Sequence, residues 1–131
     1  MEDKVLIDTS VWIDFFRKRN DELIKHIRLL LESERAVYTG IVALELINGA
    51  KGQKELQTLN DAFGTMERID ERKDTHFNAG MLGYELVRKG HTLGVVDLLI
   101  AQIAMENDTG LLSTDEHFKV IAKHSKLKLL Q

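Results

Sequence analysis

Two aspartates occupy positions at which a parallel sheet binds its ligands. Asp8 ends the first short apolar run of the chain, and Asp115 follows a second run at residues 111–114. Ligands of open parallel sheets bind beyond the carboxyl ends of the strands. Each aspartate also precedes an expected helix, so helix capping is the alternative interpretation. Next to Asp8, however, the hydroxyls of Thr9 and Ser10 already offer caps, which favours a functional role for Asp8.

Two further acids are isolated within apolar segments. Glu45 is the only charged side chain between Val37 and Ala50. A helix that is apolar nearly all round is buried, and an ionised carboxylate in it is costly unless it is paired or binds a metal. The alternatives for Glu45 are a buried salt bridge or a position at the helix rim. Asp97 is the only charged side chain between residues 90 and 104, and as a first-turn aspartate it can also simply stabilise the helix dipole.

Together, the four carboxylates predict a site for a hard divalent cation. If the sheet brings them to one crevice, their mutual repulsion is tolerable only with a multivalent cation between them. The chain has no Cys, and its five His residues show no close ligand pair, so oxygen ligation selects Mg²⁺ or Mn²⁺ over zinc. Such an ion suits metal-assisted attack of water on a phosphodiester. Ser10 and Thr114 are candidates to orient water or the phosphate, with helix capping as the alternative.

The composition fits one soluble domain over residues 1–131. A chain of 131 residues with 44% hydrophobic and 30% charged side chains can bury a core, and it is neither disordered nor fibrous. The absence of Cys excludes disulfide frameworks, thiol catalysis and iron–sulfur sites. The apolar runs are too short to span a bilayer, and the first residues show no targeting signal. We therefore expect a cytoplasmic protein without a membrane partner.

The charge balance bears on whether a polyanion can be the partner. The 21 acidic residues exceed the 18 Lys and Arg, which at first counts against a nucleic acid. Assigning four acids to a metal site leaves 17 acids against 18 bases, and the ion adds further positive charge. Two basic stretches, residues 17–19 and the lysines after Glu116, either contact an RNA backbone or form solvated faces. These lysines are Lys119, Lys123, Lys126 and Lys128.

Short β-branched runs alternate with amphipathic segments along the whole chain. Strands are expected at residues 4–7, 36–39, 111–113 and 127–130, with a further short strand possible at 66–69. Helices are expected at residues 11–16, from 21 onward, and at 41–48, 52–63, 74–87, 95–106 and 117–122. Such alternation indicates crossover connections, and therefore an α/β fold with a parallel sheet and helices on both faces.

Other conspicuous side chains have simpler interpretations. Trp12, Phe15 and Phe16 recur at helical spacing, which favours a core or a subunit interface over a platform for base stacking. His117 lies near the candidate site, but it precedes the apolar Phe118 in an expected helix. The pattern therefore favours a structural role for His117 over a role in catalysis.

Four segments in series resemble the PIN domain family. They are residues 5–14, 45–49, 97–101 and 112–118, and they extend over the whole chain in order. Within that family, they are similar to the short toxins of VapBC toxin–antitoxin systems. The resemblance implies a PIN-like three-layer fold, in which helices flank a central, mostly parallel sheet of about four or five strands.

The same resemblance implies an activity, partners and site residues. It implies an endoribonuclease that depends on Mg²⁺ or Mn²⁺, acts on structured RNA such as tRNA, forms a homodimer and is inhibited by a cognate antitoxin. The catalytic and metal-binding set carried over by position is Asp8, Glu45, Asp97 and Asp115. The family also has a hydroxyl residue at the position of Thr114. Gln102 departs from the alanine of many relatives, and Glu116 leaves open which of two adjacent acids faces the metal.

Two other functions are alternatives. A phosphoacceptor receiver domain is also an α/β fold of this size, but it needs an adjacent acid pair after the first strand, and Asp8 is followed by Thr9. A catalytically silent PIN-like module would act only through its partner, and the intact carboxylates argue against it. For the homodimer, the candidate surfaces are the aromatic first helix and the apolar stripe of Ile24, Ile27 and Leu31.

Overall fold

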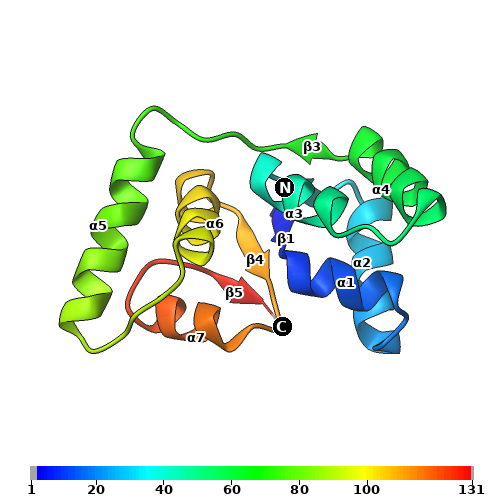
Figure 1. Cartoon of the computed structure of the whole chain (residues 1–131). Coiled ribbons are helices and arrows are strands. Elements are labelled where there is room, and N and C mark those ends of the chain that lie inside the picture. The colour runs from blue at the N-terminus through cyan, green and yellow to red at the C-terminus, as the bar shows by residue number, and fades with distance from the viewer. Residues whose placement is uncertain (1–2, 131) are drawn as a thin grey trace.

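A five-stranded parallel sheet forms the centre of the computed structural model, which describes residues 3–130. Its strand order is β3-β2-β1-β4-β5 (Figure 1). The strands are β1 (Val5–Ile7), β2 (Ala36–Tyr38), β3 (Glu67–Arg68), β4 (Gly110–Leu112) and β5 (Leu129–Leu130). Each pair of neighbouring strands runs parallel, which confirms the predicted sheet type.

Seven helices within the described residues connect and cover these strands. They are α1 (Thr9–Phe16), α2 (Asp21–Glu32), α3 (Gly40–Asn48), α4 (Gln53–Thr65), α5 (Thr75–Arg88), α6 (Val95–Glu106) and α7 (Glu116–Lys123). In Figure 1, α1, α2 and α4 lie to one side of the strands, and α5, α6 and α7 lie to the other. This arrangement is the expected three-layer α/β fold. Within residues 3–130, no helix is long and apolar enough to cross a membrane.

The central strands are more deeply buried than the edge strands. Every residue of β1 and β4 is buried, as continuous apolar runs with both faces covered by helices require. β3 and β5 have two residues each and are shorter than the expected ranges 66–69 and 127–130. Both residues of β3, Glu67 and Arg68, are exposed. A short, charged edge strand limits pairing with other chains.

The strand order switches sides of the sheet between β1 and β4. From β1 the first crossover leads to β2 on one side, whereas β4 lies on the other side and continues to β5. A crevice forms beyond the carboxyl ends of the strands at such a switch point. Asp8 follows β1, and its backbone N–H donates to the carbonyl of Leu112, the last residue of β4, at 3.0 Å. The topology therefore brings the two strand-end acids, Asp8 and Asp115, to one crevice.

The helix starts differ in part from those that the sequence predicts. Asn20 and Thr39 cap α2 and α3, because each side chain accepts a hydrogen bond from a backbone N–H three residues later. The prediction that Thr9 and Ser10 cap the first helix is wrong, since both lie within α1 and Asp8 takes the N-cap position. Their hydroxyls donate to carboxylates instead.

α3 is less buried than its apolar sequence predicts. Leu44 and Ile47 are 61% and 43% exposed, whereas Val42 and Leu46 are buried on the face towards the core. The outer face of α3 meets solvent rather than a further layer of the described chain. Glu45 is accordingly half-buried, and the prediction of a fully buried helix around it is wrong.

A carboxylate network joins α5 to α6, the helix that carries Asp97. Glu106, the last residue of α6, accepts hydrogen bonds from Thr75 Oγ1 at 2.5 Å and from Gln102 Nε2 at 3.0 Å. Burial raises the pKa of Glu106, but these hydrogen bonds and one from Asn78 outweigh it, so the pKa lies below its ordinary value. The folded state therefore favours the ionised carboxylate. Gln102, the residue that departs from the family pattern, belongs to this network.

Glu106 is expected to make the stability of the fold depend on pH in the acid range. A carboxyl group with a depressed folded-state pKa stabilises the fold above its unfolded-state pKa, and this contribution is lost as the pH falls through the folded-state value. We expect Glu106→Gln to lower the free energy of unfolding by about 1 kcal/mol near neutral pH, and by less at about pH 3. Urea unfolding at the two pH values measures both losses.

The control for this experiment is Glu85→Gln, because Glu85 is exposed on α5 and lies outside the network. It should leave the free energy of unfolding nearly unchanged at both pH values. A loss of equal size at both pH values for Glu106→Gln would contradict the prediction.

Candidate metal centre

Asp8 is the most deeply buried carboxylate of the crevice beyond β1 and β4. Only 4% of the residue is exposed. Its Oδ2 atom accepts hydrogen bonds from Ser10 Oγ at 2.7 Å and from Ser113 Oγ at 2.9 Å. These two donors compensate the carboxylate for lost water and fix its orientation. Ser10, predicted as a supporting residue, thus contacts the site through Asp8.

Asp115 reaches the same crevice from the start of α7. It occupies the N-cap position, where its Oδ1 accepts a hydrogen bond from the backbone N–H of His117 at 2.9 Å. The backbone N–H of Asp115 in turn donates to Ser113 Oγ at 3.0 Å. The capping interpretation is therefore correct for Asp115, and it coexists with a place in the crevice. A single hydroxyl, that of Ser113, contacts both strand-end acids.

Asp97 approaches from the first turn of α6 and is mostly buried. Burial raises the pKa of Asp97, a hydrogen bond with His117 lowers it, and the nearby negative charges of Asp115 and Asp8 raise it, with a net increase above the ordinary value. Both aspartates therefore lie close enough for their charges to act on Asp97. The structure brings these three predicted acids, Asp8, Asp97 and Asp115, to one place.

The imidazole of His117 lies between two of these carboxylates. Its Nδ1 atom is 3.0 Å from Asp97 Oδ2 and 3.4 Å from Asp115 Oδ1. These three side chains can each offer one donor atom, with all the donor atoms within 4.8 Å of one another. Sequence reasoning missed this contact, because it depends on how α7 lies against the start of α6.

Glu45 is held at the rim of the crevice by a hydrogen bond between two helices. Thr9 Oγ1 donates to Glu45 Oε1 at 2.8 Å, which joins α3 to the first residue of α1. The bond thus holds Glu45 against Thr9, which directly follows Asp8 in the chain. The predicted acids thus comprise an inner group of three and an outer member, Glu45.

The residues next to Asp115 in the chain differ in how exposed they are. The side chain of Thr114 is exposed, and Ser113, one residue earlier, supplies the buried hydroxyl. Glu116 is also exposed and pairs with Lys119 Nζ at 3.0 Å, so Asp115 is the acid that faces the crevice. The sequence did hold a signal for Ser113, since a polar side chain at the end of a fully buried strand must find a buried partner.

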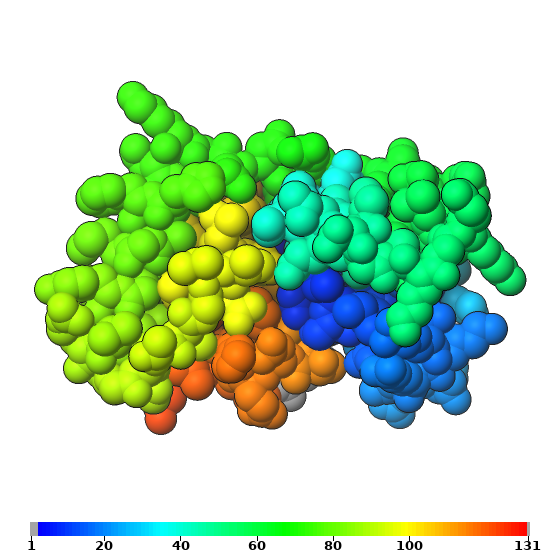
Figure 2. All heavy atoms as spheres, in the orientation of Figure 1, coloured from blue at the N-terminus to red at the C-terminus, as the bar shows by residue number. Residues whose placement is uncertain are grey.

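The N-termini of three helices meet at these carboxylates. Asp8 and Asp115 are the N-cap residues of α1 and α7, and Asp97 lies in the first turn of α6. In Figure 2, the surfaces of α1, α6 and α7 meet near the middle of the molecule. Free N–H groups and helix dipoles favour negative charge there, and they offset part of the repulsion between the acids. A donor set of three carboxylates fits Mg²⁺ or Mn²⁺, which prefer oxygen ligands.

Comparison with known proteins places the chain in a family. The model of the PIN domain family matches residues 5–124. Ribonuclease VapC2 of Rickettsia felis is 31% identical over 121 residues, which cover 88% of this chain and 90% of that protein. Ribonuclease VapC11 of Mycobacterium tuberculosis is 28% identical over 128 residues, which cover 95% of this chain and 96% of that protein.

Solved structures show the same fold. VapBC2 from Rickettsia felis, bound to a DNA fragment from its promoter, gives a TM-score of 0.77 at 28% identity and covers 96% of both chains. DNA-bound VapBC from Salmonella typhimurium gives a TM-score of 0.81 at 21% identity and covers 98% of both chains. These matches argue against the receiver-like alternative. The chain belongs to the PIN domain family and, within it, to the VapC proteins of VapBC toxin–antitoxin systems.

Proposed function

We propose that this protein is a Mg²⁺- or Mn²⁺-dependent endoribonuclease that acts in the cytoplasm as the toxin of a type II toxin–antitoxin system. Its substrate is structured RNA such as tRNA. The observation that supports this most strongly is the convergence of Asp8, Asp97 and Asp115 where three helices begin. The names of the curated relatives, which are VapC ribonucleases, support RNA as the substrate.

The side chains of the crevice have separate parts in the proposed hydrolysis. When bound, a divalent ion polarises a phosphoryl oxygen and stabilises the charge of the transition state. Asp97 and Asp115 would hold this ion, and Asp8, oriented by its two hydroxyl donors, adds a third carboxylate. Glu45 completes the acidic set at the rim. The exposed Thr114 is available to contact the scissile phosphate.

A line of basic side chains leads from the crevice along α7 and suits an RNA backbone. Lys119 and Lys123 are exposed one helical turn apart. Beyond them, the ring of His124 lies 5.2 Å from that of His91. Desolvation and the nearby charges of Lys89, His91 and Lys123 lower the pKa of His124, so the lysines rather than this ring supply the positive charge. Phosphate contacts of this kind hold RNA through the release of counterions and carry no sequence preference.

Asp97→Asn is expected to reduce RNA cleavage at least about 100-fold, because the amide keeps the size of the side chain but removes one anionic metal ligand. Cleavage of a tRNA in Mg²⁺, in Mn²⁺ and in a chelator measures the effect. The chelator should reduce RNA cleavage by the wild-type protein to the level of the variant. Asp108→Asn is the control, because Asp108 lies beyond the opposite end of α6 and pairs with Lys128 at 3.2 Å. Cleavage by Asp97→Asn at the wild-type rate would contradict the proposed mechanism, whereas a wild-type protein that does not cleave RNA would support the silent module.

The basic line predicts a salt-dependent contribution to RNA affinity. Replacing Lys89 and Lys123 together by Ala should weaken binding about tenfold and reduce the slope of log affinity against log salt by about one to two. Fluorescence anisotropy with a labelled 2′-O-methyl RNA hairpin measures both quantities. The control replaces Lys51 and Lys54 together by Ala, because these lysines line a separate cavity beside the start of α4. Equal weakening by the two double variants would show that net charge, rather than this line, determines the affinity.

A separate cavity fits the proposed antitoxin. It has a volume of about 850 Å³, lies between α1, α2 and the start of α4, and has Phe15, Phe16 and Ile24 in its apolar part. Its lining also holds four basic side chains and two acidic ones, with Lys18 and Arg28 among the basic ones. An amphipathic antitoxin helix with acidic flanks would match both the apolar part and this excess of positive charge.

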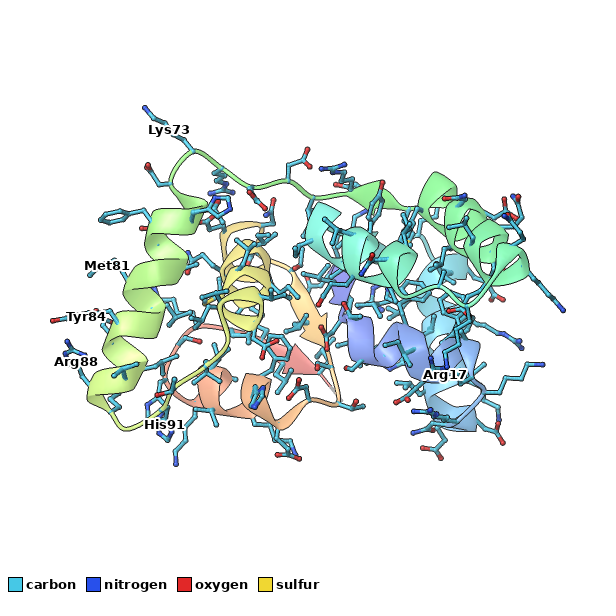
Figure 3. All side chains as sticks on the ribbon, viewed as in Figure 1. Arg17, Lys73, Met81, Tyr84, Arg88 and His91 are labelled. Atoms are coloured by element: carbon cyan, nitrogen blue, oxygen red, sulfur yellow. The ribbon has the colours of Figure 1, made fainter. Side chains whose placement is uncertain are left out.

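The surface best suited to homodimerisation lies on α5. Trp12 and Ile27 are buried in the core, which confirms the core interpretation of Trp12 and leaves less apolar surface for a dimer on the first two helices than the sequence predicts. Phe77, Met81 and Tyr84 instead form an exposed apolar stripe at helical spacing along α5. In Figure 3, Met81 and Tyr84 project away from the body of the molecule. A second copy that packs its α5 against this one would cover both stripes.

Met81→Asp should weaken the homodimer at least about tenfold, because it buries a charge at the centre of the proposed contact. Light scattering over a range of protein concentrations measures the dissociation constant. Leu29→Asp is the control, since Leu29 is 63% exposed on α2, away from the stripe. A monomeric wild type, or a dimer that Met81→Asp leaves intact, would contradict the assignment of α5.

A further inference from the structure

His117 combines a fixed backbone with a ring aimed into the acidic crevice. It is the second residue of α7, between Glu116, whose side chain pairs with Lys119 outside the crevice, and Phe118, which is fully buried. The buried Phe118 anchors this turn of the helix against the core. His117 is therefore the side chain of the first turn of α7 that meets Asp97.

The spacing of three donor atoms matches that of neighbouring ligands on one ion. Ligands at about 2.1 Å from an octahedral ion and at right angles to one another are about 3.0 Å apart. His117 Nδ1 lies 3.0 Å from Asp97 Oδ2 and 3.4 Å from Asp115 Oδ1. An ion could therefore bind all three atoms with only small movements of the side chains.

The chemistry of imidazole allows this exchange of a hydrogen bond for a metal bond. A neutral imidazole carries its proton on one ring nitrogen and offers a lone pair on the other. When the proton is on Nε2, Nδ1 is free to bind a metal ion. Asp97 and Asp115 repel one another across the crevice, and an ion between them removes the repulsion more completely than an imidazole can.

We propose that His117 Nδ1 is a direct ligand of the divalent ion held by Asp97 and Asp115, and that it shifts the preference of the site from Mg²⁺ towards Mn²⁺. This inference rests on the proposed metal-dependent function and goes beyond the acidic set carried over from the family. Mg²⁺ strongly prefers oxygen ligands, whereas first-row transition ions accept imidazole nitrogen more readily. A nitrogen ligand therefore penalises Mg²⁺ relative to Mn²⁺.

Pulsed electron paramagnetic resonance of the Mn²⁺-loaded protein tests the ligand directly, without reference to activity. A nitrogen bound to Mn²⁺ produces a ¹⁴N modulation of the electron spin echo. We expect this modulation in the wild-type protein and its loss in His117→Gln. His26→Gln is the matched control, because His26 lies on α2, away from the crevice, and it should retain the modulation.

Calorimetric titration with Mn²⁺ and Mg²⁺ tests the ion preference. His117→Gln should weaken Mn²⁺ binding about tenfold and Mg²⁺ binding by a smaller factor. Because the side chain of His117 is 60% exposed, the variant should fold, and circular dichroism checks this.

The outcomes separate this inference from the proposed function. Two results would overturn the role of His117 and leave the metal-dependent nuclease intact. One is Mn²⁺ binding to the wild type with no ¹⁴N modulation, and the other is an equal loss of affinity for Mn²⁺ and Mg²⁺ in the variant. A wild type that binds neither ion and cleaves RNA equally well in a chelator would overturn both. Loss of the modulation in His117→Gln alone supports the proposed ligand.

Discussion

Asp8, Asp97 and Asp115 carry like charges into one crevice, and their mutual repulsion is the constraint to which the surrounding structure responds. Repulsion between carboxylates is strong where burial lowers the local dielectric constant. The chain offsets part of it in several ways. Hydroxyl groups donate to Asp8, three helix N-termini point at the acids, and the imidazole of His117 lies between Asp97 and Asp115. These devices are incomplete substitutes for a cation, which is why the same arrangement is suited to bind one.

Some of these compensations join segments that are far apart in the sequence. The hydrogen bond from Ser113 to Asp8 spans 105 positions, and it exists because β4 pairs with β1 in the register Leu6 to Leu111. The first turn of α6 is positioned in a similar way from a distance, because Glu106 fixes the other end of that helix to α5. The apolar core and a polar network outside the crevice thus determine where the carboxylates lie.

The sequence predicted those features that have a local signal. An acid at the end of an apolar run, or isolated within one, is visible in a single window, and this placed Asp8 and Asp97 correctly in the fold. Features that depend on the direction of a side chain between elements were missed. Thr9 was expected to cap a helix, but Glu45 on α3 offers its hydroxyl a carboxylate acceptor that no local rule describes. His117 was missed for the same reason.

The position of the charges matters more than their sum for binding a polyanion. At physiological ionic strength the screening length is about 8 Å, so an RNA phosphate senses mainly the charges beside it. Acids that bind a cation contribute little repulsion, and the surface next to them carries Lys119 and Lys123. A chain with a net charge of −3 can therefore present a favourable path to RNA. Because that path begins at the proposed metal ligands, a site without its ion would expose the phosphates to the uncompensated carboxylates. Under the proposed function, binding of the metal and binding of RNA should therefore reinforce one another.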